Sequence, residues 1–199
     1  MNTDLLIYTV HALFWSAFGI TRIVVQRSSR LATESAGQAS VTSPATASYS
    51  RAVLAIHFVA FALLYFGLGT TVNLNRVPGI FFGQSLVGTL VMAIGSALMC
   101  WALAHFASWR LRAKLDAGHR LATEGPFRWL RHPIYMGLNL LAIGSAILAP
   151  APVMWAGALL MCVGSDVRAR AEEKLLAQAF GATYTDYCAH TRRFVPGIY

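Results

Sequence analysis

Long apolar stretches separated by polar ones dominate the chain. Three of them, at residues 5–25, 52–72 and 82–106, reach the length of about 20 mostly apolar residues that a helix needs to cross a bilayer. A fourth block, residues 133–165, is too long for one span and is interrupted by the proline-containing segment 149–152. Because proline lacks an amide donor and disfavours helix in the residue before it, this block predicts a hairpin of two short helices. The pattern therefore predicts an all-α membrane protein with about five transmembrane helices, the last two in a C-terminal helical hairpin.

The polar segments divide the chain further. Residues 26–50 are rich in Ser, Thr, Ala and Gln and lack apolar periodicity, so we expect a mobile loop there. Residues 166–180 have the composition of a helix that enters water after the hairpin. We therefore expect N-terminal transmembrane helices in residues 1–106, and a C-terminal part in residues 107–199 that holds the hairpin and a cytosolic tail.

Composition and charge agree with a membrane location. The chain is 56% hydrophobic and 12% charged, whereas soluble domains carry about 25% charged residues. Threading the spans through a bilayer leaves all but one of the 16 Lys and Arg residues on one side, the exception being Arg76. The positive-inside rule assigns that side to the cytosol, so we expect the N-terminus outside and the C-terminus in the cytosol. The positive-inside rule therefore accounts for the net charge of +8, and we expect no nucleic-acid partner.

Polar residues gather at the mouth of the predicted hairpin. Arg131, His132 and Tyr135 stand where its first helix begins, and Arg168 and Glu172 follow the second apolar half. Because a hairpin returns its two ends to the same side, His132 and Glu172 can approach each other despite their separation in sequence. This arrangement predicts a cytosolic pocket with apolar walls and a few converging polar groups, which is typical of a small-molecule site.

Each of these residues also has a structural interpretation. Arg131 could be a positive-inside anchor, His132 a helix cap and Tyr135 an interfacial aromatic residue. Arg168 and Glu172 are four residues apart and could form a surface ion pair.

The remaining histidines and the cysteines carry weaker signals. His11 and His57 lie inside predicted spans, but no paired spacing supports a heme-associated or cofactor-free accessory protein. Cys100, Cys162 and Cys188 are odd in number and far apart, so we expect neither a disulfide framework nor a metal site.

A specific set of motifs spans approximately residues 109–196. It comprises His119-Arg120-Leu121 through Gly125, Arg131-His132-Pro133-Ile134-Tyr135, the proline-broken hairpin, Arg168 four residues before Glu172-Glu173, Phe180-Gly181 with Tyr184 and Tyr187, and Arg192-Arg193-Phe194-Val195-Pro196. In this order and spacing the motifs resemble those of the isoprenylcysteine carboxyl methyltransferase family of integral membrane methyltransferases. The N-terminal half resembles the family only in being transmembrane.

The resemblance implies methyl transfer from S-adenosylmethionine to a lipophilic small-molecule or lipidated acceptor, for which a carboxylate such as that of isoprenylcysteine is one candidate. It implies that Arg168 faces the acceptor's carboxylate and that Arg168 and Glu172 are the catalytic residues. The residues it implies for the cofactor pocket are His119, Leu121, Ala122, Phe127, His132, Pro133, Ile134, Tyr135 and Glu172. Phe127 departs from the family's frequent Tyr and therefore lacks a hydroxyl. Arg112 occupies a position that sometimes carries an amide, so we assign it no role.

A second resemblance leaves an alternative open. Membrane sterol reductases share an Arg-His-Pro-x-Tyr-x-Gly element, here residues 131–137, and a basic-aromatic end such as residues 193–199. That reading implies an NADPH-dependent reductase. The short chain and the Arg168-x-x-x-Glu172-Glu173 pattern favour the methyltransferase.

Overall fold

A computed structural model describes residues 3–34, 44–73, 82–105 and 121–199. Within these residues the chain forms helices, and the one pairing of extended segments is an isolated bridge between Leu130 and Arg192. The all-α prediction is therefore confirmed for the part of the chain described. The helices are α1 (Thr3–Glu34), α2 (Pro44–Asn73), α3 (Phe82–His105), the short 3-10 helix η1 (Gly125–Arg128), α4 (Pro133–Leu148), α5 (Pro152–Phe180) and α6 (Ala182–His190).

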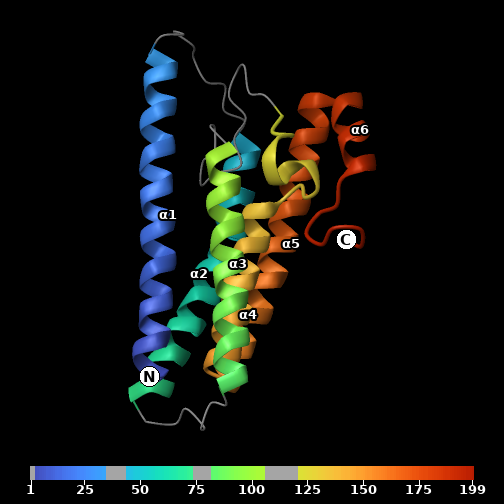
Figure 1. The fold of residues 1–199 in the computed structure, drawn as a ribbon. Coiled ribbons are helices and arrows are strands. Elements are labelled where there is room, and N and C mark those ends of the chain that lie inside the picture. Colours follow the sequence, from blue (N-terminus) through green and yellow to red (C-terminus); the bar gives the residue numbers. More distant parts are fainter. Residues whose placement is uncertain (1–2, 35–43, 74–81, 106–120) are drawn as a thin grey trace.

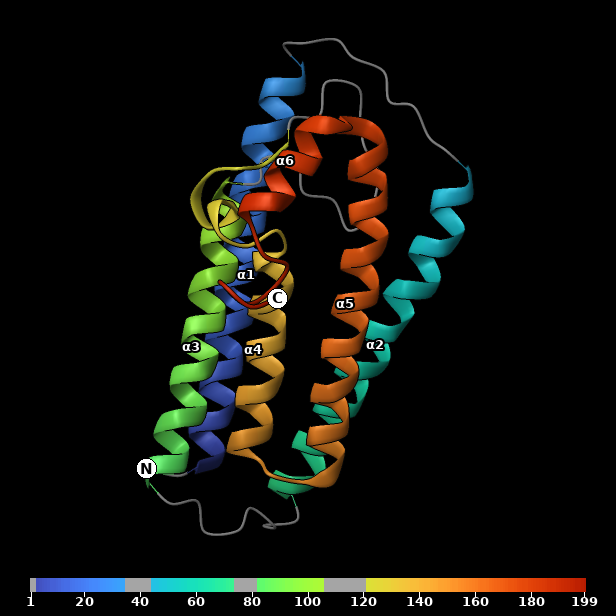
Figure 2. The ribbon, with the colours of Figure 1, turned by 90° about the vertical axis from the view of Figure 1, so that its right-hand side faces the viewer.

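The five long helices lie side by side and alternate in direction, so that α4 and α5 form the C-terminal hairpin (Figure 1). Helix α3 packs against α1 and α4, whereas α2 packs against α5. Figure 2 shows α4 between α1 and α3 on one side and α5 and α2 on the other. Helix α6 is folded over the end of the bundle that lies opposite the N-terminus. The hairpin predicted from the proline-containing segment is confirmed.

Among the described residues, three helices are long and apolar enough to cross a membrane, at Leu5–Val24, Leu54–Thr71 and Gly83–His105. Helix α4 is also apolar but has only 16 residues. Large apolar side chains point outward from the bundle, as expected for surfaces that face lipid rather than water. Leu13, Phe58, Phe66 and Leu159 are between 63% and 67% exposed. The count of five spans and the orientation of the termini stay predictions.

Two boundaries differ from those expected. The loop prediction for residues 26–50 is wrong at both ends, because α1 continues to Glu34 and α2 begins at Pro44. Residues 35–43 lie outside the described part of the chain. The polar composition marks where a segment leaves lipid, whereas Gln, Arg, Leu and Ala continue a helix equally well in water. For the same reason residues 166–180 form one uninterrupted helix with the second arm of the hairpin.

Glycine pairs allow α3 and α4 to approach closely. A Cβ atom placed on Gly95 of α3 would lie 2.8 Å from the carbonyl oxygen of Gly137 on α4. One placed on Gly144 would lie 2.8 Å from the carbonyl oxygen of Gly88. Small residues that let backbones touch are a common basis of helix association in membranes. The contact fixes α4, whose first turn carries the predicted site residues.

A chain of hydrogen bonds joins α1 and α2 to α4. The Trp15 indole donates to the Tyr65 hydroxyl, which lies 3.2 Å from Nδ1 of His11. Nε2 of His11 lies 3.1 Å from Oγ of Ser145, whose proton goes to the Leu141 carbonyl oxygen at 2.7 Å. Because Ser145 has a single proton, His11 must donate from Nε2 and accept at Nδ1. Both ring nitrogens of His11 are thereby satisfied, which indicates that His11 has a structural role.

Candidate functional site

The residues that precede α4 are held in place by the C-terminal segment. The amide of Arg131 donates to the Arg192 carbonyl at 2.7 Å, and the amide of His132 donates to the Arg193 carbonyl at 3.2 Å. In return, the amide of Arg192 donates to the Trp129 carbonyl at 3.0 Å. His132 occupies the N-cap position of α4, but its side chain makes no capping hydrogen bond. Its imidazole is buried and available for another role.

A cavity lies at this end of the hairpin, between the segment before α4, the upper part of α5, and α6. The empty space among its walls, including the opening to solvent, is about 570 Å³. It is lined by Leu121, Ala122, Phe127, Arg131, His132, Pro133, Ile134, Tyr135, Glu172, Leu176, Tyr184 and Tyr187.

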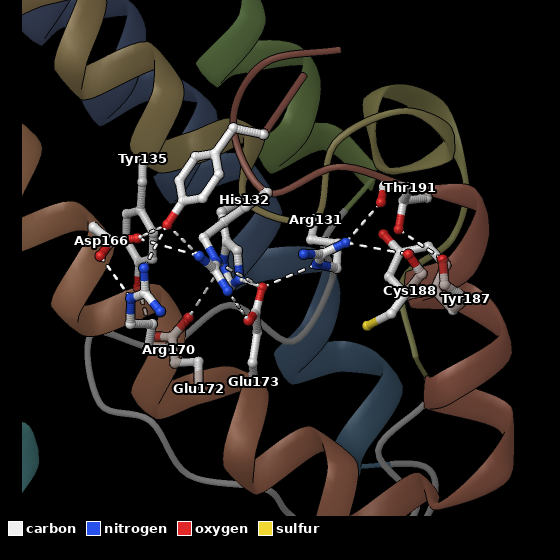
Figure 3. Close-up of polar contacts among 12 residues, drawn as sticks. Arg131, His132, Tyr135, Asp166, Arg170, Glu172, Glu173, Tyr187, Cys188 and Thr191 are labelled. Atoms are coloured by element: carbon white, nitrogen blue, oxygen red, sulfur yellow. Dashed lines mark hydrogen bonds and ion pairs between the residues drawn. The ribbon is translucent and has the colours of Figure 1, made fainter. Parts of the chain in front are cut away.

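The carboxylate of Glu172 is held by one of its two oxygens. The Tyr135 hydroxyl donates to Oε1 at 2.5 Å (Figure 3). Nε of Arg168 donates to the same oxygen at 3.1 Å. The other oxygen, Oε2, lies 3.8 Å from Nδ1 of His132. The predicted approach of His132 and Glu172 across the hairpin is therefore confirmed. Oε1 is fixed by protein donors, which leaves Oε2 as the oxygen through which Glu172 can meet a ligand.

Aromatic stacking orders the same group. The His132 ring stacks on the Tyr135 ring with centroids 5.6 Å apart and an interplanar angle of 10°. The guanidinium carbon of Arg168 lies 5.2 Å from the centroid of the Tyr135 ring, in a cation–π arrangement. Tyr135 is thus in contact with His132, Arg168 and Glu172, and it fixes the position of all three relative to α4.

The neighbouring Glu173 has a different environment. It accepts from Nε of Arg131 at 2.9 Å and from Nη2 of Arg193 at 2.6 Å, and its Oε1 lies 3.4 Å from Nε2 of His132 (Figure 3). Burial alone would raise the pKa of Glu173, but the close approach of His132 and the hydrogen bonds from Arg193 and Arg131 hold that pKa well below its usual range. Glu173 is therefore an anion that connects α5 with the segment before α4 and with the C-terminal segment.

A second ion pair extends this network. Nη1 of Arg193 lies 3.3 Å from Oδ1 of Asp166, which also accepts from the Tyr199 hydroxyl at 2.8 Å. Nε of Arg170 donates to the other oxygen of Asp166 at 2.7 Å. Burial acts to raise the pKa of Asp166, but the donors Arg170 and Tyr199 and the charge of Arg193 lower it overall. The C-terminal segment is therefore anchored to α5 at two carboxylates.

The structure brings together most of the residues predicted for a cofactor. Leu121, Ala122, Phe127, His132, Pro133, Ile134, Tyr135 and Glu172 all line the one cavity. His119 lies outside the described residues. Arg168 does not line the cavity. It is 8% exposed and lies behind Tyr135 and Glu172, one turn nearer the apolar part of α5.

Three side chains of the cavity wall were assigned no role from the sequence. Leu176 follows Glu172 by one helical turn, so its position on the same face of α5 could have been deduced. Tyr184 and Tyr187 come from α6, and no periodicity in the sequence indicates that α6 folds back over the cavity. The Tyr187 hydroxyl donates to the Phe127 carbonyl at 2.7 Å. The Tyr184 hydroxyl is buried and, among the described residues, has no hydrogen-bond partner.

A sequence profile of the isoprenylcysteine carboxyl methyltransferase (ICMT) family matches residues 86–178, which run from α3 through the hairpin and the Glu172-Glu173 pair. In this region the chain is similar to the isoprenylcysteine carboxyl methyltransferase family. The match includes most of the cavity wall, and together with the long apolar helices it supports an integral membrane protein.

Two curated members of the ICMT family are similar to this chain. A protein-S-isoprenylcysteine O-methyltransferase of Saccharomyces cerevisiae is 32% identical over 114 residues, which are 52% of this chain and 45% of that protein. The protein-S-isoprenylcysteine O-methyltransferase B of Arabidopsis thaliana is 29% identical over 89 residues, 44% of this chain and 45% of its own. The chain therefore spans about half the length of these relatives.

The fold has a counterpart among solved structures. The structure of the eukaryotic intramembrane Ras methyltransferase ICMT, without a monobody, matches all of this chain and 69% of its own chain, with a TM-score of 0.64 and 24% identity. The likeness includes the N-terminal helices, whose sequence resembles the family only in its apolar character. It shows that these helices and the hairpin share the ICMT fold.

Proposed function

We propose that this protein is a methyltransferase that binds S-adenosylmethionine in the cavity at the mouth of the hairpin and methylates a lipophilic acceptor. The observation that carries the proposal is the convergence of the predicted cofactor residues on one cavity, with Oε2 of Glu172 beside His132. Similarity to the ICMT family supports the reaction class. The family match and the named relatives favour methyl transfer over the alternative of an NADPH-dependent reductase.

The chemistry of the cavity fits this cofactor. S-adenosylmethionine presents cationic groups, a carboxylate and an aromatic base, and each is costly to bury without a partner. Glu172 offers a carboxylate with one oxygen still available for a cation. The buried Tyr184 hydroxyl, which has no protein partner among the described residues, offers a donor, and Arg131 adds a positive charge to the same wall. Leu121, Leu176 and the aromatic side chains form apolar surfaces against which a base can pack.

In this proposal the bound cofactor supplies an activated methyl group. Glu172 then offsets positive charge, while Tyr135 and Arg168 keep its carboxylate oriented through Oε1. The apolar walls exclude water, so the charges in the site interact more strongly than in solution. If the acceptor is a carboxylate, the residues have to align it and no general base is required.

Arg168 is the residue we assign to the acceptor. It lies one turn nearer the apolar half of α5 than Glu172, on the side from which a lipid-soluble acid would arrive. A guanidinium can hold a carboxylate by two parallel hydrogen bonds, which a lysine cannot reproduce. Since two relatives are named as protein-S-isoprenylcysteine O-methyltransferases, we propose an isoprenylcysteine carboxylate as the first acceptor to test.

Calorimetry on the full chain in lipid nanodiscs tests the cofactor assignment. We expect S-adenosylmethionine and S-adenosylhomocysteine to bind and NADPH not to bind. Glu172→Gln keeps the oxygen that Tyr135 and Arg168 hold but loses the charge, so it should weaken binding about 10- to 100-fold. Glu124→Gln, at an exposed glutamate, is the matched control. Binding of NADPH in place of either adenosyl ligand, or unchanged affinity in Glu172→Gln, would overturn the assignment.

The acceptor is tested separately by methyl transfer. Labelled S-adenosylmethionine is supplied with an S-farnesylcysteine derivative or with a membrane lipid extract, and the labelled product is identified. We expect a base-labile methyl ester on the farnesylcysteine carboxylate. Arg168→Ala should raise the KM for that acceptor more than the dissociation constant of the cofactor. A labelled amine or thioether from the extract, with no ester, would disprove the carboxylate acceptor.

A further inference from the structure

Polar side chains of α4 and α5 are arranged as a ladder that descends from the cavity into the apolar part of the hairpin. Going down, α4 contributes His132 at its N-cap, then Tyr135, then Asn139, while α5 contributes Glu172, Arg168 and Ser165. The spacings of three and four residues on α4 are mirrored by four and three on the antiparallel α5, so each helix presents these residues on one face. The two upper rungs are the contacts of Glu172 with His132 and of Arg168 with Tyr135.

The lowest rung is a hydrogen bond between the two arms of the hairpin. Ser165 donates from Oγ to Oδ1 of Asn139 at 2.8 Å, and both residues are buried. Nε2 of His57 on α2 lies 3.4 Å from the same Oγ. Because the single proton of Ser165 goes to Asn139, His57 must be the donor in this contact. The rung therefore has a direction, from His57 through Ser165 to Asn139.

Helix α2 supports the rung at close range. A Cβ atom placed on Gly164, beside Ser165, would lie 2.9 Å from Ile56 and 3.3 Å from Cε1 of His57. The His57 ring also lies 6.1 Å from the Tyr135 ring, measured between centroids. The Asn139–Ser165 pair is thus linked to Tyr135 in two ways. Asn139 follows Tyr135 by one turn of α4, and His57 lies near both Ser165 and the Tyr135 ring.

This position makes the rung sensitive to helix register. In a helix, one residue corresponds to a rise of about 1.5 Å and a rotation of about 100°. A slip of that size would break the contacts of Oε1 of Glu172 with Tyr135 at 2.5 Å and with Arg168 at 3.1 Å. Apolar surroundings offer Asn139 and Ser165 few other hydrogen-bond partners, so their pairing opposes such a slip.

We propose that Asn139 and Ser165, braced by His57, are positioning residues that set the register of α4 against α5 and so present Glu172 to the cavity. The effect of these residues on cofactor binding rests on the proposed function. Their effect on the alignment of α4 with α5 does not. None of the three is among the residues that line the cavity. They act through Tyr135 and Glu172.

The test compares Ser165→Ala and Asn139→Leu with Ser145→Ala. Ser145 is an equally buried serine of the same hairpin that bonds to His11 on α1. The first readout needs no ligand: the NMR signal of the ¹³Cζ atom of Tyr135, assigned by its loss in Tyr135→Phe, reports the hydrogen bond to Glu172. We expect this signal to shift in Ser165→Ala and in Asn139→Leu, and to stay unchanged in Ser145→Ala. The double variant should shift it no further than the larger single effect.

Cofactor affinity is the second readout. We expect about three- to tenfold weaker binding of S-adenosylhomocysteine in Ser165→Ala, with a loss of thermal stability no greater than in Ser145→Ala. A Tyr135 signal that is unchanged in both rung variants, or that shifts equally in Ser145→Ala, would overturn the proposal. If the wild-type protein binds no adenosyl ligand, the proposed function fails, while the Tyr135 signal still decides whether the rung positions the site.

Discussion

Replacement of Glu173 by glutamine separates the two adjacent glutamates by their physical roles. The Glu173 carboxylate neutralises Arg131 and Arg193, whose side chains are only 14% and 13% exposed. Glutamine keeps one acceptor oxygen but leaves two mostly buried guanidinium groups without an anionic partner. Breaking a buried ion pair costs about 3–5 kcal/mol, and the residual exposure here favours the lower end, about 3 kcal/mol. For a chain of this length that corresponds to a fall in Tm of about 6–12 °C.

The pH dependence of stability gives an independent signature of Glu173. Its folded-state pKa lies below the ordinary value of 4.5, so the native state binds fewer protons than the unfolded state in that range. The stabilisation is fully present above about pH 4.5 and is lost as the pH falls toward the folded-state pKa. We therefore expect the wild-type Tm to fall below about pH 4.5, and part of this slope to disappear in Glu173→Gln.

The assay is thermal unfolding in nanodiscs, followed by circular dichroism between pH 3 and pH 8. Glu172→Gln is the comparison, because it removes the anionic partner of one guanidinium, that of Arg168, whereas Glu173→Gln removes that of two, so it should lose less stability. Glu124→Gln should leave Tm unchanged within error. The reasoning is refuted if Glu173→Gln unfolds at the wild-type temperature, or if Glu172→Gln is the less stable of the two variants.

Two further predictions follow from the cavity and from helix packing. Tyr184→Phe removes a buried hydroxyl that has no partner within the described residues, so Tm should be unchanged while S-adenosylhomocysteine binds about two- to tenfold more weakly in calorimetry. Equal affinity in the two proteins would remove Tyr184 from the site. Gly137→Ala brings a Cβ atom within 2.7 Å of the Gly95 carbonyl oxygen and should destabilise the protein by about 1–3 kcal/mol, whereas Gly69→Ala, with open space around it, should not. Similar unfolding temperatures for the two glycine variants would show that α3 and α4 are not in tight contact.

The features that could be predicted from the sequence depend on local physics. Apolar stretches of sufficient length identified the helices, and the proline-containing segment 149–152 identified the hairpin, because both signals are properties of short pieces of chain. The approach of His132 and Glu172 followed from the hairpin alone. The end of α1 and the start of α2 did not follow. Both helices extend into the polar segment 26–50, where the sequence is no longer apolar but the chain is still helical.

Features that depend on contacts between distant elements could not be predicted in this way. Nothing in the sequence indicates that α6 folds over the cavity. The positions of Tyr184 and Tyr187 in the cavity wall therefore could not be predicted. Asn139 and Ser165 stand out little within apolar helices, and their pairing depends on how α4 and α5 are aligned. His57 lies inside a predicted span, and its link to the hairpin emerges only from the packing of α2 on α5.

The length of α4 has a consequence for the surrounding lipid. Its 16 residues extend over about 24 Å, whereas the hydrocarbon core of a typical bilayer is about 30 Å thick. If α4 crosses the bilayer as predicted, either the bilayer is thinner around the hairpin or the hydrocarbon extends past one end of α4, which is the condition known as hydrophobic mismatch. His132 and Pro133 stand at one end of α4. Acyl-chain length therefore belongs to the environment of the site, and it is a variable to be controlled whenever the protein is reconstituted.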